Sequence, residues 1–360
     1  MPGIPKPKTN FVLLGPYPPP YGGVAIFNQN LFEATKENGE PEMWTHTKHL
    51  KRTDKVKYYK PDFINTFRFL LANGSKKTIL DSSIFSAEYP EVGVVLAWVI
   101  LKPFLRFNWI KVFHDGSLPS RYHSFTFLQK LAIKLSVAFY DQALPVSQDL
   151  FSWLNKTFLL KNKIRQISSL LPIPDKIIKS RKSSVLKNDF PPDIKLVCSM
   201  GAFIPSYGFK QIADTVNMIR IQKNQNIGLI LIAGGFKEDL IYKEQTLKNR
   251  DWIMVFHDIP HQEAINIIRA SDVLIRATEE ESYGLCKVEA LLCETPVLAT
   301  STGETRGMFL YNLFDKQQMT DQLIEILKNG KSPDHQKFVE MYQAEAKQNL
   351  QSILTALKAF

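Results

Sequence analysis

Short apolar segments of strand length alternate with longer segments of helical periodicity along the first half of the chain. Apolar positions at helical spacing cover residues 22–31 and 128–139. The strand candidates cover residues 10–15, 77–81, 109–114 and 142–147. Because strands that alternate with helices form βα units, this half is predicted to be a Rossmann-like α/β domain with a parallel sheet.

The same pattern returns in the second half of the chain. Its strand candidates cover residues 195–201, 228–235, 252–256, 272–276 and 296–300. Between the halves the periodicity lapses in a polar stretch flanked by prolines, as is typical of a linker. We therefore predict an α/β fold with two Rossmann-like domains facing a central cleft. The predicted parts are a first domain at 1–174, a linker at 175–193, a second domain at 194–334 and a closing C-terminal helix at 335–360.

Two carboxylates, Glu281 and Glu289, stand eight residues apart across a glycine turn that opens a predicted helix. A helix N-terminus offers unpaired N–H groups and a partial positive charge, so Gly284 and Leu285 are candidates to bind a diphosphate through their main chain. Glu281 is then expected to face a sugar, and Glu289 to accept hydrogen bonds from ribose hydroxyls. A glutamate pair on a solvated helix face is the structural alternative.

The segment from Glu281 to Glu289, with the Thr-Pro-Val-Leu-Ala-Thr strand at 295–300, resembles the donor-site signature of retaining glycosyltransferases of family 4. This resemblance implies the two-domain GT-B fold, transfer with retention and independence of metal ions and other cofactors. It also implies an acceptor that attacks the face that the nucleotide leaves, with the departing phosphate helping to remove the proton. The donor-binding residues that it indicates in this segment are Ser282, Tyr283, Gly284, Leu285 and Glu289.

Three further segments are similar to this family. The proline-rich loop at 16–24 has Gly22 and Gly23 where the family brings its backbone close to the donor phosphate and the acceptor. His114 follows a strand at the position of a family histidine near the donor sugar, where the resemblance implies a catalytic role. Gly303 lies in a turn similar to one beside the donor phosphates. The structural alternatives are a stiffened turn for the glycines and a satisfied strand-end residue for the histidine.

The clearest departure from the family lies after residue 199. Gly201 and Tyr207 are expected to contribute to the donor site, but Ala202 and Tyr207 stand where the family usually has basic residues that neutralise the donor diphosphate. Charge stabilisation of a leaving group is a large catalytic term, so another cation is needed. Lys210 is the first candidate, because a short displacement on the same loop–helix turn brings an ammonium toward the phosphates. Nearby alternatives in the sequence are Lys287 and Arg306.

The positive charge of the protein is concentrated in its first half. Residues 1–174 contain 22 of the 45 Lys and Arg and 12 of the 35 Asp and Glu, so the rest is balanced at 23 of each. A basic face suits nucleic acid or an anionic membrane, and charge alone does not decide between them. The densest basic stretch covers residues 48–60, for which a solvated loop is the structural alternative. We expect no nucleic-acid partner and leave the anionic membrane open.

Composition and cysteine usage are typical of a soluble protein: hydrophobic residues make up 44% and charged residues 22%. The three cysteines lack metal-ligand spacing and are expected to be reduced, and no metal site is predicted. The apolar stretch at 92–107 is interrupted by charge and proline, which favours a buried helix over a membrane-contacting one. No signal peptide is recognised, so the expected location is cytoplasmic, with peripheral attachment at the inner membrane face left open.

The predicted function is that of a retaining glycosyltransferase, of the hexosyltransferase type, acting in cell-surface polysaccharide synthesis. Its expected partners are a nucleotide-sugar donor and a glycan or lipid-linked acceptor. A non-catalytic glycosyltransferase-like subunit is one alternative, because Ala202 and Tyr207 are residues that loss of the phosphate clamp would leave. A GT-B sugar-nucleotide epimerase is another. A dinucleotide oxidoreductase is poorly supported, since neither half contains a full G-x-G-x-x-G.

Overall fold

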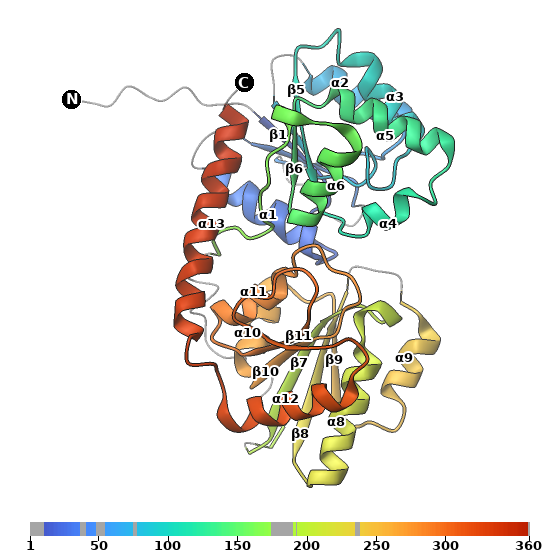
Figure 1. Ribbon diagram of the computed structural model, residues 1–360. Helices are drawn as coiled ribbons and strands as arrows, with labels where there is room; N and C mark the ends of the chain where they lie inside the picture. The colour runs from blue at the N-terminus through green and yellow to red at the C-terminus, as the bar shows by residue number, and fades with distance from the viewer. Residues whose placement is uncertain are drawn as a thin grey trace, which may run out of the picture. The chain divides into compact units, whose positions relative to one another are not determined.

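The computed structural model divides into two compact units (Figure 1). It describes residues 11–36, 41–47, 55–74, 78–173, 190–191, 193–234 and 238–358. The first unit runs from the N-terminus to Pro19, from Val24 to Leu171 and from Ala346 to the C-terminus. The second unit comprises Pro20–Gly23 and Pro172–Glu345. The predicted linker at 175–193 lies for the most part outside the described residues.

The first unit is built on a parallel sheet of six strands in the order β3-β2-β1-β4-β5-β6. The strands are β1 (Phe11–Leu14), β2 (Glu42–Thr45), β3 (Val56–Tyr58), β4 (Thr78–Asp81), β5 (Asn108–Phe113) and β6 (Gln142–Pro145). The helices are α1 (Gly23–Thr35), α2 (Phe63–Asn73), α3 (Val92–Leu101), α4 (Leu118–Tyr122), α5 (Phe127–Phe139) and α6 (Gln148–Phe158), followed by the 3₁₀ turn η1 (Lys161–Lys163).

Burial on both faces explains why the strands of this sheet appear as continuous apolar segments in the sequence. All four residues of β1 are buried, as are all four of β4. Aromatic packing fixes α3 on the sheet, where the ring of Trp98 stacks on that of Trp109 with centroids 4.1 Å apart. Tyr140 meets Trp109 edge-on. The strands predicted in this half are confirmed.

Two strands of the first sheet, β2 and β3, were not predicted. Both are short, and β3 lies within the basic stretch at 48–60, of which residues 48–54 are outside the described part. Lys57 of β3 pairs with Glu42 of β2 at 3.0 Å. A solvated loop over residues 56–58 is therefore wrong, because main-chain pairing to β2 orders these residues as an edge strand.

The second unit repeats the architecture with a parallel sheet in the order β12-β11-β10-β7-β8-β9. Its strands are β7 (Lys195–Gly201), β8 (Ile227–Ala233), β9 (Ile253–His257), β10 (Val273–Arg276), β11 (Val297–Thr300) and β12 (Phe309–Tyr311). Its helices are α8 (Phe209–Lys223), α9 (Leu240–Leu247), α10 (His261–Ala270), α11 (Leu285–Leu292) and α12 (Lys316–Asn329), with the 3₁₀ turn η3 (Pro205–Tyr207).

The strand order of the second sheet determines where a ligand site is expected. Its first strand, β7, pairs with β8 on one side and with β10 on the other, so connections run in opposite directions from this point. Open α/β sheets bind ligands at such a switch point, outside the carboxyl ends of the strands. Gly201 ends β7 and Arg276 ends β10, which places both residues at this edge.

The helix predicted over residues 335–360 is observed as α13 (His335–Lys358). It belongs to the second unit as far as Glu345 and to the first unit from Ala346 onward. In the first unit Ile353 and Leu357 join the core, and Asn349 donates hydrogen bonds to main-chain carbonyls of the segment after η1. Within the described residues, every helix is too short or too polar to cross a bilayer.

Candidate functional site

Helix α11 begins at the glycine turn that the sequence singled out. Gly284 precedes its first residue with φ +82°, a left-handed conformation that favours glycine. A Cβ at this position would approach the side chains of Glu281 and Lys287. Among the residues that the structure describes, the N–H groups of Gly284 and Leu285 have no acceptor. The turn therefore offers main-chain donors at a positive helix end, and the contact of these donors with a diphosphate stays a prediction.

Glu281 lies in a buried ion cluster beside this turn. Its Oε1 accepts hydrogen bonds from Arg276, at 3.0 Å from Nε and 2.5 Å from Nη2. Its Oε2 lies 3.3 Å from the Nζ of Lys287, which also donates to the Thr302 carbonyl at 2.5 Å. Both carboxylate oxygens are thus engaged by protein cations. The predicted contact of Glu281 with a sugar stays a prediction.

This cluster contains more basic groups than acidic ones. Arg276 and Lys287 share the single carboxylate of Glu281, and all three side chains are at most 9% exposed. Burial would raise the pKa of Glu281, yet the charges of Arg276 and Lys287 outweigh it and leave that pKa lowered. Burial raises the pKa of the neighbouring Cys286 thiol to about 11, which keeps it neutral. One positive charge is left over in the cluster, and buried charge is costly without a counterion.

The segment that lacks the family's basic residues packs against Arg276. The guanidinium lies over the ring of Tyr207, 4.7 Å from its centroid, and donates to the carbonyl of Met200 at the end of β7. Gly201 is required here, because a Cβ would overlap the ring of Tyr207. Ala202 is buried. A cation thus occupies this edge of the sheet, but it comes from β10 rather than from the loop after β7.

Glu289 projects from the last turns of α11 into a second buried pair. Its Oε1 lies 2.7 Å from the Nε2 of His261, the first residue of α10. Burial alone would lower the pKa of His261, but the charge of Glu289 and their hydrogen bond leave it raised. Glu289 is therefore held in one orientation by a partner that the sequence analysis did not identify. Its predicted hydrogen bonds to a ribose stay a prediction.

The turn at Gly303 packs directly on the glycine turn before α11. Gly303 has φ +62°, and a Cβ there would meet the carbonyl of Tyr283. That carbonyl accepts the N–H of Glu304 at 2.8 Å, and the Tyr283 hydroxyl donates to Glu345 at 2.9 Å. The structure thus brings the predicted residues Glu281, Tyr283, Gly284 and Gly303 together. Ser282 lies between them in the same turn.

The other two candidate cations are engaged elsewhere. Lys210 pairs with Asp214 one turn along α8, at 2.8 Å, and lines a hollow of about 260 Å³ with Tyr242 and Phe314. The lining of this hollow includes neither Glu281 nor Glu289. Arg306 is half-exposed and bound by Glu304 and Glu345. Of the three basic residues considered from the sequence, Lys287 is the one that contacts Glu281.

His114 lies in the first unit at the end of β5. It is buried against Phe27, and burial followed by the charge of Lys111 lowers its pKa to about 3. The imidazole is therefore neutral at physiological pH, which suits a hydrogen bond to a hydroxyl better than stabilisation of negative charge. Its Nε2 is buried and has no partner among the described residues.

Glu88 supports the segment that follows β5. Its Oε1 accepts the main-chain N–H groups of His114 and Asp115 at 2.5 and 2.7 Å, while its Oε2 is buried without a partner in the described part of the chain. Burial raises the pKa of Glu88 to about 7 in spite of the charge of Lys111. The carboxyl group therefore positions the backbone at His114 and titrates near neutral pH.

The loop before α1 contains the remaining predicted residues. Gly22 and Gly23 have open space where a side chain would start, since a Cβ would meet no atom of the described residues within 4 Å, apart from its chain neighbours. Packing therefore does not require glycine at either position. Residues 20–23 belong to the second unit. Contact of this loop with a donor stays a prediction.

The sequence analysis did not assign a role in these sites to Arg276, His261 or Glu88. A signal for Arg276 was present in the sequence, because a charged residue at the end of an otherwise apolar strand is unusual and indicates a paired, buried charge. Lys287 gives the same signal within an apolar helix. His261 and Glu88 offered no comparable pattern. Their partners, Glu289 and the N–H groups after β5, are 28 and 26 or more residues away in sequence.

Comparisons with known proteins agree with this architecture. Residues 180–348 match the family model described as glycosyl transferases group 1. Trehalose synthases of Thermococcus litoralis and Pyrococcus furiosus are each 28% identical over 148 residues, which is 38% of this chain and 36% of theirs. The chain thus matches about a third of the length of these curated relatives.

Several solved structures share the whole fold at low sequence identity. HepE of Anabaena, in complex with UDP and glucose, has a TM-score of 0.72 at 15% identity and covers 98% of this chain and 100% of its own. The E. coli structure described as trehalose-6-phosphate bound with UDP-2-fluoro glucose has a TM-score of 0.71 at 10% identity, covering 98% and 99%. Sucrose-phosphate synthase of Thermosynechococcus elongatus has a TM-score of 0.68 at 14% identity, covering 96% and 94%.

The fold is therefore GT-B, with two Rossmann-like units, each built on a parallel six-stranded sheet. The family match includes the Glu281–Glu289 segment and covers somewhat less than half of the chain.

The ion cluster predicts a stability effect specific to Glu281. Glu281→Gln leaves Arg276 and Lys287 buried without a carboxylate, so we expect a loss of about 3–5 kcal/mol in the free energy of unfolding. Glu280→Gln, at an exposed neighbour in the same acidic run, should change it by less than about 0.5 kcal/mol. Denaturant unfolding of both variants measures this, and equal effects would show that the cluster does not depend on Glu281.

Glu88 predicts a pH dependence of stability. Its pKa is about 7 in the folded chain, against an ordinary value of 4.5. The stability that the native protein gains from protonating Glu88 is therefore fully present below pH 4.5 and is lost as the pH rises through 7. Relative to Glu88→Gln, the native protein should lose up to about 3 kcal/mol of stability between pH 4.5 and 8. Denaturant unfolding of both proteins at several pH values tests this, with Glu91→Gln as an exposed control. A constant difference between native protein and Glu88→Gln would contradict it.

Proposed function

We propose that this chain is a retaining, metal-independent glycosyltransferase that moves a sugar from a nucleotide-sugar donor to a glycan or lipid-linked acceptor in cell-surface polysaccharide synthesis. The observation that carries the proposal is the buried pair of cations, Arg276 and Lys287, beside the open N-terminus of α11. An excess buried positive charge next to main-chain N–H donors suits a diphosphate better than any neutral ligand.

In this proposal the donor diphosphate lies at Gly284 and Leu285, whose main-chain N–H groups have no acceptor in the described part of the chain. Lys287 and Arg276 offset the charge that develops as the phosphate leaves, replacing the basic residues absent at positions 202 and 207. Glu281 then has two roles, because it holds the two cations in place and also faces the sugar. Glu289, held by His261, is oriented to accept hydrogen bonds from the ribose hydroxyls.

The reaction that fits these groups is a direct exchange at the sugar carbon. The acceptor oxygen forms a bond to that carbon while the bond between the carbon and the diphosphate oxygen breaks. The acceptor attacks on the same face of the sugar that the diphosphate leaves. The departing phosphate oxygen takes the proton of the acceptor hydroxyl. His114, whose low pKa keeps its imidazole neutral, contributes a hydrogen bond to a substrate hydroxyl rather than a charge.

UDP-glucose is the first donor to test, since structures of Anabaena HepE contain UDP and UDP-glucose and the E. coli neighbour contains a UDP sugar. The purified chain should release UDP from UDP-glucose, or the corresponding nucleotide from another member of a nucleotide-sugar panel, only when an acceptor extract is added. Absence of donor binding and release across the panel would favour a non-catalytic subunit. An epimerised free nucleotide sugar formed without acceptor would favour an epimerase.

Donor affinity should depend on Glu289. We expect Glu289→Gln to weaken nucleotide-sugar binding about tenfold or more, since a hydrogen bond to a charged group contributes about 1.5–3 kcal/mol. Glu294→Gln is the matched control, because Glu294 is exposed and pairs with Lys331. Calorimetric titration gives both affinities, and thermal unfolding verifies that both variants are folded. Equal affinities would argue against a ribose site at Glu289.

Transfer rates should identify the cation that replaces the usual phosphate clamp. Lys287→Met removes the excess charge but keeps the length of the side chain, and we expect kcat to fall about a hundredfold. Lys210→Met removes a cation that already pairs with Asp214, and we expect a fall of less than about fivefold. Steady-state kinetics compares the two. The reverse order would return the phosphate role to Lys210, the candidate chosen from the sequence.

A further inference from the structure

Helices α2, α3 and α5 lie side by side in the first unit (Figure 1). Each turns one side toward the core, with Leu70, Trp98 and Ile133 among the buried residues. The opposite sides form what we call the outer helical face, together with the loop after α3. Large apolar side chains on this face are exposed at Phe63, Ile64, Leu71, Leu96, Ile100, Phe104, Phe127, Leu128 and Leu131.

These exposed side chains come from three helices that pack in a row, α2 against α3 and α3 against α5, and from the loop after α3. Apolar side chains gathered on one face of a soluble protein often mark a site that binds another surface. The most exposed of these side chains are the rings of Phe104, at 79%, and Phe127, at 78%. Neither ring is covered within the protein, although each would be stabilised in an apolar medium.

The outer helical face also lacks acidic residues. Residues 63–73, 92–107 and 118–139 contain no Asp or Glu, whereas their basic residues are Arg68, Lys102, Arg106, Arg121, Lys130 and Lys134. Lys102 pairs with Asp141, and Arg121 pairs with Asp115. The acidic residues that adjoin these segments, Asp62 and Glu91, are the N-caps of α2 and α3. The charge of the face is therefore positive.

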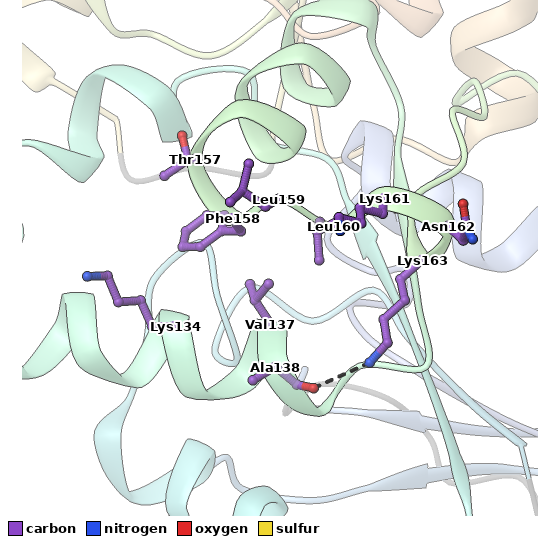
Figure 2. A pocket seen from close by; sticks show the side chains of 10 residues that line it. All are labelled: Lys134, Val137, Ala138, Thr157, Phe158, Leu159, Leu160, Lys161, Asn162 and Lys163. Carbon is purple, nitrogen blue, oxygen red and sulfur yellow. Dashed lines mark hydrogen bonds between the residues drawn. The ribbon is translucent and has the colours of Figure 1, made fainter.

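A hollow at the C-terminal end of α5 continues this positive charge (Figure 2). Its volume is about 580 Å³, and Lys134, Lys161 and Lys163 surround an apolar floor that includes Phe158. The Nζ of Lys163 lies 3.5 Å from the carbonyl of Ala138. The lining residues include no carboxylate, so an anionic group can enter without repulsion.

We propose that the outer helical face docks on an anionic lipid bilayer. Phe104, Phe127 and the exposed aliphatic side chains enter the interface between headgroups and acyl chains, and the basic residues, with those of the hollow, lie among the lipid phosphates. A second copy of this chain fits less well, because a two-fold contact would place one acid-free cationic face against another. The proposal is independent of the donor chemistry at α11.

Co-sedimentation with vesicles tests this proposal. We expect the full-length chain to bind vesicles that contain phosphatidylglycerol, and to bind pure phosphatidylcholine vesicles more weakly. The double variant Phe104→Ser/Phe127→Ser should reduce binding to the anionic vesicles about tenfold or more. Arg106→Gln/Lys134→Gln should reduce it about fivefold for each charge removed, and added salt should weaken what binding remains.

The matched control is Leu240→Ser/Ile241→Ser on α9 in the second unit, where the side chains are 74% and 70% exposed. It should bind the vesicles like the native protein, and circular dichroism should show all variants folded. Equal loss in control and test variants would overturn the proposal, as would native protein that binds no vesicle. Gel filtration that shows a dimer broken by Phe104→Ser/Phe127→Ser would assign the face to a second copy instead.

Discussion

The second unit depends on one buried interaction, the sharing of the Glu281 carboxylate by Arg276 and Lys287. It joins the end of β10, the turn before α11 and, through Lys287 and the Thr302 carbonyl, the turn after β11. Arg276 also reaches the end of β7 through the Met200 carbonyl. Segments that are separate in sequence are therefore held at the switch point of the sheet. The same charges that fix this geometry leave a positive potential at the open end of α11.

The cations beside the α11 turn come from β10 and from α11 itself. In the family that the sequence resembles, basic residues are usual at the positions of Ala202 and Tyr207, in the loop after β7. In the structure the ring of Tyr207 lies beneath the guanidinium of Arg276, so the space beside Gly201 still adjoins a positive group. What a diphosphate requires is charge and donors at a location, and their position in the sequence is secondary.

The first unit has buried ionisable groups at the carboxyl ends of its own strands, but they are arranged differently. Lys111 of β5 is fully buried, donates to the Ser83 carbonyl and lies 3.9 Å from Asp81 at the end of β4. Glu88 orders the backbone at His114 and keeps one unpartnered oxygen among the described residues. On the outer helical face of this unit, α2, α3 and α5 expose large apolar side chains and contain no Asp or Glu.

The pattern of residues along the chain was enough to predict the two α/β halves, most strands of both sheets and the glycine turn at Gly284, because hydrophobic periodicity and left-handed backbone are local properties. Short edge strands such as β3 were not predicted from the sequence, since their pairing depends on a neighbouring strand rather than on their own pattern of residues. The identity of the cations that contact Glu281, and the pairing of His261 with Glu289, became known only from the folded structure. These contacts join residues from different elements or depend on which side chains share a buried space, and spacing along the chain predicts neither.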